Sequence, residues 1–308
     1  MQIRSLGPIA VVIAVSLAAA APVAAQQKAR PDLALTKASD DVANPDHGFQ
    51  SENGDFSAAY TVKNKGNATS PKSEVRVALV PPLGGRIDVM IDPIPKLKPG
   101  KSFSTLVEDT IKLNMELGAY KAEICVVPHF KQLRNRKAND CRDVPKRYYL
   151  GKRSWTGTGS GNSTYSTGGL TATQSWQAPA LTYNFGSYAS PGRFTYNLSG
   201  GSVNYQVSGG GSGCTSAGGA TVGISGGELK LDYGASRYNI KAESPAATQV
   251  PYVITCNGQS ANTYTFAITP FVTDAGRAPV LAFGETNLHE QRQTSSQGAS
   301  VTLNWDLK

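Results

Sequence analysis

Apolar residues alternate with polar ones along most of this chain, and no other feature restricts the fold as much. In FSAAYTVK, residues 56–63, the apolar positions are Phe56, Ala58, Tyr60 and Val62. Successive side chains of a β-strand point to opposite faces of a sheet, so this spacing predicts a half-buried strand. SEVRVALV, residues 73–80, repeats the pattern after a cluster of turn residues. We expect an all-β chain, in which only LVEDTIKLNMEL, residues 106–117, is also compatible with a helical turn.

The composition changes near Gly151. Residues 26–150 hold most of the charged side chains, whereas Gly, Ser, Thr, Asn and Tyr dominate from Gly151 onward. A mature chain of about 280 residues is long enough for two domains of ordinary size. We therefore predict one domain over residues 26–150 and a second over residues 151–308.

Both parts are predicted to be β-sandwiches. About seven short strands with turn signals between them favour a β-sandwich for the first part. The second part is expected to be a larger sandwich or jelly-roll-like domain of about eight to ten strands. RFTYNLSGGSVNYQV predicts a hairpin around Ser199–Gly201, and ATVGISGGELKLDY predicts another at Gly226–Gly227. PYVITC, TYTFAITPFV, APVLAFG and SVTLNWDL are expected to supply four further strands.

Residues 1–25 have the features of a secretory signal peptide. Arg4 precedes a mostly apolar run, and Val23 and Ala25 occupy the −3 and −1 positions of a cleavage site. No later segment offers about 18 consecutive apolar residues, so we expect no membrane span after cleavage. The protein is predicted to be secreted, to the periplasm or the extracellular medium.

Four cysteines remain after export, and an oxidising compartment favours disulfides. The sequence has neither C-x₂-C pairs nor clustered histidines, so no metal site is expected. Four cysteines allow three pairings. We predict Cys125–Cys141 and Cys214–Cys256, because each of these pairs lies within one composition block.

An ordered set of short motifs in the first part resembles the CARDB family of bacterial, extracellular, immunoglobulin-like domains. The motifs are Pro31-Asp32-Leu33, the N-x-G turn at Asn64 and Gly66, Leu97-x-Pro99-Gly100, and Gly118-x-Tyr120 leading to Cys125. The resemblance covers residues 30–150. It implies a seven-stranded accessory module used for adhesion or for positioning a neighbouring domain, without catalytic residues. The second part resembles no family that we recognise.

The loop between the first two cysteines departs from this family. Members tend to carry acidic residues and asparagines there, but this loop has basic residues in its middle, so a cation-binding loop is in doubt. The bases between Lys131 and Arg153 form a predicted basic patch, which should attract polyanions. The patch consists of Lys131, Arg134, Arg136, Lys137, Arg142, Lys146 and Arg147, followed by Lys152 and Arg153.

Catalytic chemistry finds little support in the sequence. The three histidines, His47, His129 and His289, adjoin no nucleophile elbow and are interpreted as surface residues. No cofactor is expected. Aromatic residues early in the second domain are candidates for stacking against sugars, although core packing is the alternative. They are Trp155, Tyr165, Trp176, Tyr183 and Tyr188.

Three functional hypotheses follow. The first is a secreted, non-catalytic adhesion or cell-envelope binding protein that recognises a surface glycan or an anionic polymer. Export makes nucleic acid an unfavourable partner. The second hypothesis is a secreted hydrolase with its site in the second domain. The third is a structural component of the envelope that works through oligomerisation.

Overall fold

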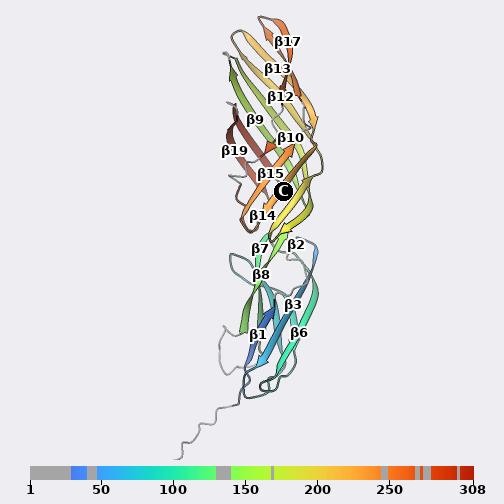
Figure 1. Ribbon diagram of the computed structural model, residues 1–308, viewed down its shortest axis with the longest axis vertical. Coiled ribbons are helices and arrows are strands. Elements are labelled where there is room, and N and C mark those ends of the chain that lie inside the picture. The colour runs from blue at the N-terminus through green and yellow to red at the C-terminus, as the bar shows by residue number, and fades with distance from the viewer. Residues whose placement is uncertain are drawn as a thin grey trace, which may run out of the picture.

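The structure is a computed structural model that describes residues 29–39, 47–129, 140–167, 170–243, 249–267, 271–272, 279–296 and 299–308. The predicted signal peptide, residues 1–25, lies outside the described residues. Strands dominate throughout, and the molecule is elongated, with the early strands at one end and the later ones at the other (Figure 1). The expectation of an all-β chain with β-sandwich domains is confirmed.

Residues 33–151 form two sheets that pack face to face, and we call them the first domain. One sheet has the order β1-β3-β6 and the other the order β2-β8-β7-β4-β5. The strands are β1 (Leu33–Ser39), β2 (His47–Phe49), β3 (Asn53–Asn64), β4 (Ser73–Val80), β5 (Ile87–Ile94), β6 (Ser102–Lys112), β7 (Gly118–Val127) and β8 (Cys141–Gly151). The segment that was compatible with a helical turn or a strand is a strand as far as Lys112.

The alternating residues of the first domain meet in its core. Phe56, Ala58, Tyr60 and Val62 of β3 face Val75, Val77 and Leu79 of β4, and all of them are buried. Every second position of each strand therefore points between the two sheets, as the period of two predicts. Side chains at the intervening positions are left on the outer faces.

Residues 154–307 form the second domain, in which twelve strands belong to one hydrogen-bonded network. They are β9 (Ser154–Thr167), β10 (Leu170–Ser190), β11 (Arg193–Leu198), β12 (Ser202–Gly211), β13 (Cys214–Gly223), β14 (Gly226–Asp232), β15 (Arg237–Glu243), β16 (Gln249–Cys256), β17 (Gln259–Ala267), β18 (Phe271–Val272), β19 (Leu288–Ser296) and β20 (Ala299–Leu307). The sheet folds over itself, because buried Trp305 of β20 donates a hydrogen bond to Tyr238 of β15, on a distant part of the network.

Both predicted hairpins of the second domain are wrong. β11 and β12 do not pair with each other; each pairs with a different half of the long strand β10. β13 pairs with β12 and β14 pairs with β11, so the chain does not reverse at Ile224–Ser225 but only interrupts a long strand there. The residues at 199–201 interrupt what is otherwise one long strand. Gly200 and Gly201 have φ values of 128° and 152°, which only glycine adopts readily, so they bend the strand without reversing it.

The chain reverses direction at two places where the sequence analysis did not predict a turn. β10 and β11 are joined through Pro191-Gly192, and β12 and β13 are joined through Ser212-Gly213. Gly192 and Gly213 both have φ of 79°, as tight turns require. The predicted strand APVLAFG is also wrong, because within its described residues only Val280 makes an isolated bridge, to Arg237. Broken long strands explain why the domain has more strands than expected.

Candidate functional site

The two predicted disulfides are present. Cys125 and Cys141 join the adjacent strands β7 and β8, 16 residues apart in the chain. Cys214 and Cys256 join β13 and β16, 42 residues apart. The described residues contain no free cysteine. Each bridge therefore ties two neighbouring strands of one domain.

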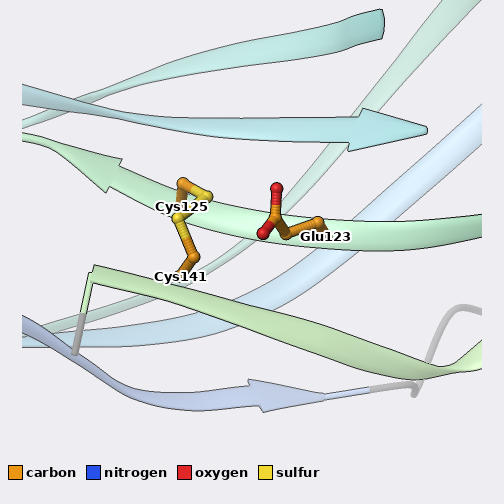
Figure 2. A group of neighbouring side chains, drawn as sticks. All are labelled: Glu123, Cys125 and Cys141. Carbon is orange, nitrogen blue, oxygen red and sulfur yellow. A yellow bond between two sulfur atoms is a disulfide. The ribbon is translucent and has the colours of Figure 1, made fainter. Parts of the chain in front are cut away.

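The first bridge lies on a charged outer surface of the first domain that we call the disulfide face. Its residues are Arg76, Arg86, Asp88, Lys121, Glu123, Cys125, Cys141 and Arg147. Glu123 lies beside Cys125 and Cys141 in a group that could resemble a metal site (Figure 2). Both sulfur atoms are used in the disulfide, so they are not thiolate ligands. The Arg86 guanidinium instead donates to a Glu123 carboxylate oxygen at 3.0 Å and to the Cys125 sulfur at 2.7 Å. The group is an ion pair against a disulfide and not a set of free metal ligands.

Ion pairs continue across the disulfide face toward the edge strand β5. Arg86 also bonds Asp88, and Arg76 contacts both Asp88 and Glu74. Hydrogen bonds to Glu74 and the charge of this carboxylate raise the pKa of Arg76. Neighbouring carboxylates match the charges of these arginines, which leaves them little capacity for an external anion.

The described bases of the predicted patch lie on β8. Arg142, Lys146 and Arg147 are exposed. Lys131, Arg134, Arg136 and Lys137 lie outside the described residues. Arg147 pairs directly across the sheet with Lys121 of β7, which is also exposed. The flanking pair, Tyr120 and Tyr148, is buried, so Lys121 and Arg147 point outward together.

Lys121 is a candidate site residue that the sequence interpretation missed. Its position in GAYKAEICVV, between the inward positions Tyr120 and Ala122, already placed it on the outer face. Only the register of β7 against β8 brings it opposite Arg147. Acidic Glu123 and Asp143 form the next outward pair of the same ladder, and Glu123 is already bound by Arg86.

The last two bases of the patch have another role, because Lys152 and Arg153 lie at the junction of the two domains. Lys152 lies 4.4 Å above the Trp155 ring and donates to the Thr286 carbonyl oxygen. Arg153 covers the Phe49 ring at 3.8 Å and makes two hydrogen bonds to Glu52, at 2.7 and 3.0 Å. Both bases therefore link β8, β9 and the β2 region, and the charge of Arg153 is already paired with Glu52.

Aromatic residues complete the junction. His47 is stacked on Tyr188, with ring centroids 3.8 Å apart, and Phe49 packs edge-on against Phe185. Phe283 of the second domain packs against Tyr120 of the first. The junction lies where β2, β7 and β8 approach the second domain (Figure 1). The interpretation of His47 as a surface residue is wrong, because an aromatic partner from the other domain covers it.

The predicted aromatic contact surface is also wrong in most of its members. Trp155, Trp176 and Tyr183 are buried in the core of the second domain, and Tyr188 belongs to the junction. Tyr165 alone of the five is exposed, at 41%. Burial of these aromatic side chains removes a large apolar area from water and so stabilises the fold. They are core residues and do not form a binding surface.

The motif residues that suggested a family converge on one side chain. Asn64 is fully buried, and its amide oxygen accepts hydrogen bonds from the backbone N–H groups of Asp32 and Gly66. Its amide nitrogen donates to the carbonyl oxygens of Ala68 and Leu97, both at 2.8 Å. Pro31-Asp32-Leu33, the N-x-G turn and the Leu97 motif are thus joined by Asn64 at one end of the first domain.

Among solved structures, the chain is similar to the CARDB domain of a Pyrococcus furiosus protein, whose crystal structure was solved in complex with di-metal ions. The match has 16% sequence identity and a TM-score of 0.27, and it covers 39% of this chain and 94% of that chain. No family model matches the chain, and neither does any curated protein.

The part of the chain that the structure describes contains no helix with the length and hydrophobicity of a membrane span. Disulfides form and persist mainly outside the reducing cytosol, so the two bridges are typical of an exported protein.

Proposed function

We propose that this protein is a non-catalytic adhesion-type protein of the cell envelope that binds an anionic surface polymer through the disulfide face. The observation that carries the proposal is the Lys121–Arg147 pair. Two like charges directly opposite each other on a sheet are destabilising. In this pair both side chains are exposed, and among the described residues neither makes an ion pair or a hydrogen bond. A partner that supplies negative charge would relieve this repulsion.

Neighbouring residues support an anionic partner over a neutral sugar. Lys146 adds an exposed base next to Arg147 on β8, and four further bases of the patch precede Cys141 in the sequence. A neutral sugar would be expected to stack on exposed aromatic rings, but the predicted aromatic residues are mostly buried. The immunoglobulin-like module and the two disulfides suit an adhesion protein that works outside the cytosol.

Retention on phosphocellulose resin tests the proposal. We expect the variant K121Q/R147Q to elute at lower salt than the wild type, because two unpaired bases of the face are lost. The matched control is R193Q/K230Q, which removes the same net charge from the second domain, where Arg193 and Lys230 are already paired with Asp232 and Glu228. The control should shift less.

Binding to isolated, protein-free envelope polymer should follow the same order. Equal retention of the wild type and K121Q/R147Q would contradict the proposal. An equal shift of the two variants would show that net charge, and not the disulfide face, governs retention. Circular dichroism confirms that each variant is folded.

A further inference from the structure

β17 (Gln259–Ala267) ends the twelve-stranded sheet at the tip that lies far from the first domain (Figure 1). Within the described residues it pairs with β16 alone. Thr263, Tyr264 and Thr265 are consecutive and all exposed, so neither face of the sheet is covered at this point. Tyr264 is 41% exposed and stacks on Tyr252 of β16, with ring centroids 5.7 Å apart.

The other terminal strands in the described sheets carry features that prevent pairing with another chain. An edge strand is protected by charged side chains, by proline or by short length. β1, β6 and β19 contain charged residues, and β5 contains charged residues together with Pro93. β2 has three residues and β18 has two. β17 has nine residues and contains neither a charge nor a proline.

The register shows which backbone groups of β17 face outward. A Cβ placed on Gly218 of β13 would lie 2.3 Å from the Pro251 carbonyl oxygen, so this carbonyl points toward β13. Neighbouring residues direct their backbone groups to opposite sides, so Tyr252 bonds with its partner Tyr264 on β17. The N–H and C=O groups of Thr263 and Thr265 therefore point to the open side.

We propose that β17 is a dimerisation edge that pairs antiparallel with β17 of a second copy of this chain. An antiparallel pair of identical strands has two-fold symmetry, so one surface serves both partners and the assembly closes as a dimer. No charged residue of β17 would meet its own copy. Exposed Thr and Tyr side chains would pair across the new ladder, and such cross-strand pairs are favourable.

A second copy fits this edge better than a foreign strand. Peptides that add to a sheet edge are selected through pockets for alternate side chains. The described side chains around the edge, Thr263, Tyr264, Thr265 and Val253, are exposed and carry no charge that would select one. Dimerisation would also present two disulfide faces on one particle, which strengthens binding to a repetitive polymer. The inference does not depend on the proposed function, since solution mass is measured without a ligand.

Sedimentation equilibrium of the full chain over a concentration series tests the inference. We expect the wild-type mass to rise from one chain to two. T265K and T265P should stay at one chain: lysine brings like charges together across the two-fold axis, and proline removes the outward N–H. The matched control Q293K adds the same charge at an exposed position of β19, the opposite edge, and should dimerise like the wild type.

Amide hydrogen exchange provides a second readout that does not depend on a variant folding. The amides of Thr263 and Thr265 should become protected as the wild-type concentration rises, whereas that of Tyr264 should be protected at every concentration. A wild type that remains one chain throughout overturns the inference. So does a wild-type dimer that T265K and T265P leave intact, or one that Q293K disrupts equally.

Discussion

The first and second domains bury alternating strands in different ways. The first packs two separate sheets, places ion pairs on its outer face and closes one end with the hydrogen bonds of Asn64. The second folds one continuous sheet around large aromatic side chains, and seven of its strands, β9, β10, β12, β13, β16, β17 and β18, contain no charged residue. The difference teaches that the placement of charge, and not strand content, decides what each domain can contact.

The largest expected effect is the difference in stability loss between a buried and an exposed aromatic residue. Trp155→Ala removes a fully buried side chain and should lower the free energy of unfolding by about 4 kcal/mol. Tyr165→Ala, at the exposed aromatic position, should change it by less than about 1 kcal/mol. Chemical denaturation of both variants measures the difference. Similar losses would mean that Tyr165 is packed in solution.

Removing each disulfide tests how the two domains depend on their bridges. In the chain-entropy model the loop of 42 residues in the second domain is worth about 4 kcal/mol and the loop of 16 residues in the first about 3 kcal/mol. C214A/C256A should therefore lower the free energy of unfolding of the second domain more than C125A/C141A lowers that of the first. Calorimetry decides the order, and a reversed order would show that native contacts outweigh loop length.

Asn64→Ala tests the hydrogen-bonded end of the first domain. The substitution leaves two backbone N–H groups and two carbonyl oxygens without their partner in a buried place, and it should lower stability by about 3 kcal/mol. The control is Asn204→Ala, an exposed position of the second domain with one side-chain hydrogen bond. Its effect should stay within about 0.5 kcal/mol. Comparable losses of stability in the two variants would show that the hydrogen bonds of Asn64 do not stabilise the first domain as expected.

The last prediction concerns the stability of the second domain at alkaline pH. Burial raises the pKa of Tyr183, Tyr196 and Tyr233 in the second domain above the ordinary value of 10.0. The unfolded chain then loses these protons first, so their contribution is complete below pH 10 and is lost as the pH rises toward the folded pKa. Each tyrosine should remove about 1.4 kcal/mol of stability per pH unit in that window.

Tyr183→Phe checks this pH dependence. Its stability should fall less steeply above pH 10 than that of the wild type, and Tyr165→Phe serves as an exposed control. Denaturation at a series of pH values measures the slope. A Tyr183→Phe variant with the wild-type slope would show that Tyr183 titrates freely in the folded chain.

Part of the structure could be predicted because it depends on local pattern. The alternation at Phe56, Ala58, Tyr60 and Val62 dictates a half-buried strand wherever that strand is placed. The glycines at 200 and 201 misled the interpretation, because the same residue type permits a reversal or a bend. Which of the two occurs depends on the strand beside it, and here the unbroken β10 runs past the break.

The candidate site residues also divide into those that a local pattern predicts and those that depend on the neighbouring strand. The exposed positions Arg142, Lys146 and Arg147 followed from their place in a basic run, whereas the pairing of Arg147 with Lys121 depends on a register that no local pattern encodes. The aromatic candidates were misplaced, because a tryptophan on a strand looks the same in the sequence whether its face is covered or open. The fold-back of the sheet covers Trp155 and Trp176.

Strand content, the two composition blocks and the choice of cysteine partners were accessible from the order of residues alone, since each depends on neighbours in the chain or on compartment. Tertiary structure decided the rest. It brought Lys121 beside Arg147, moved Lys152 and Arg153 from the predicted patch into the junction, and left β17 as an uncharged terminal strand. The physical reason is that sheet order and register join segments far apart in sequence, and their energies depend on which strand lies alongside.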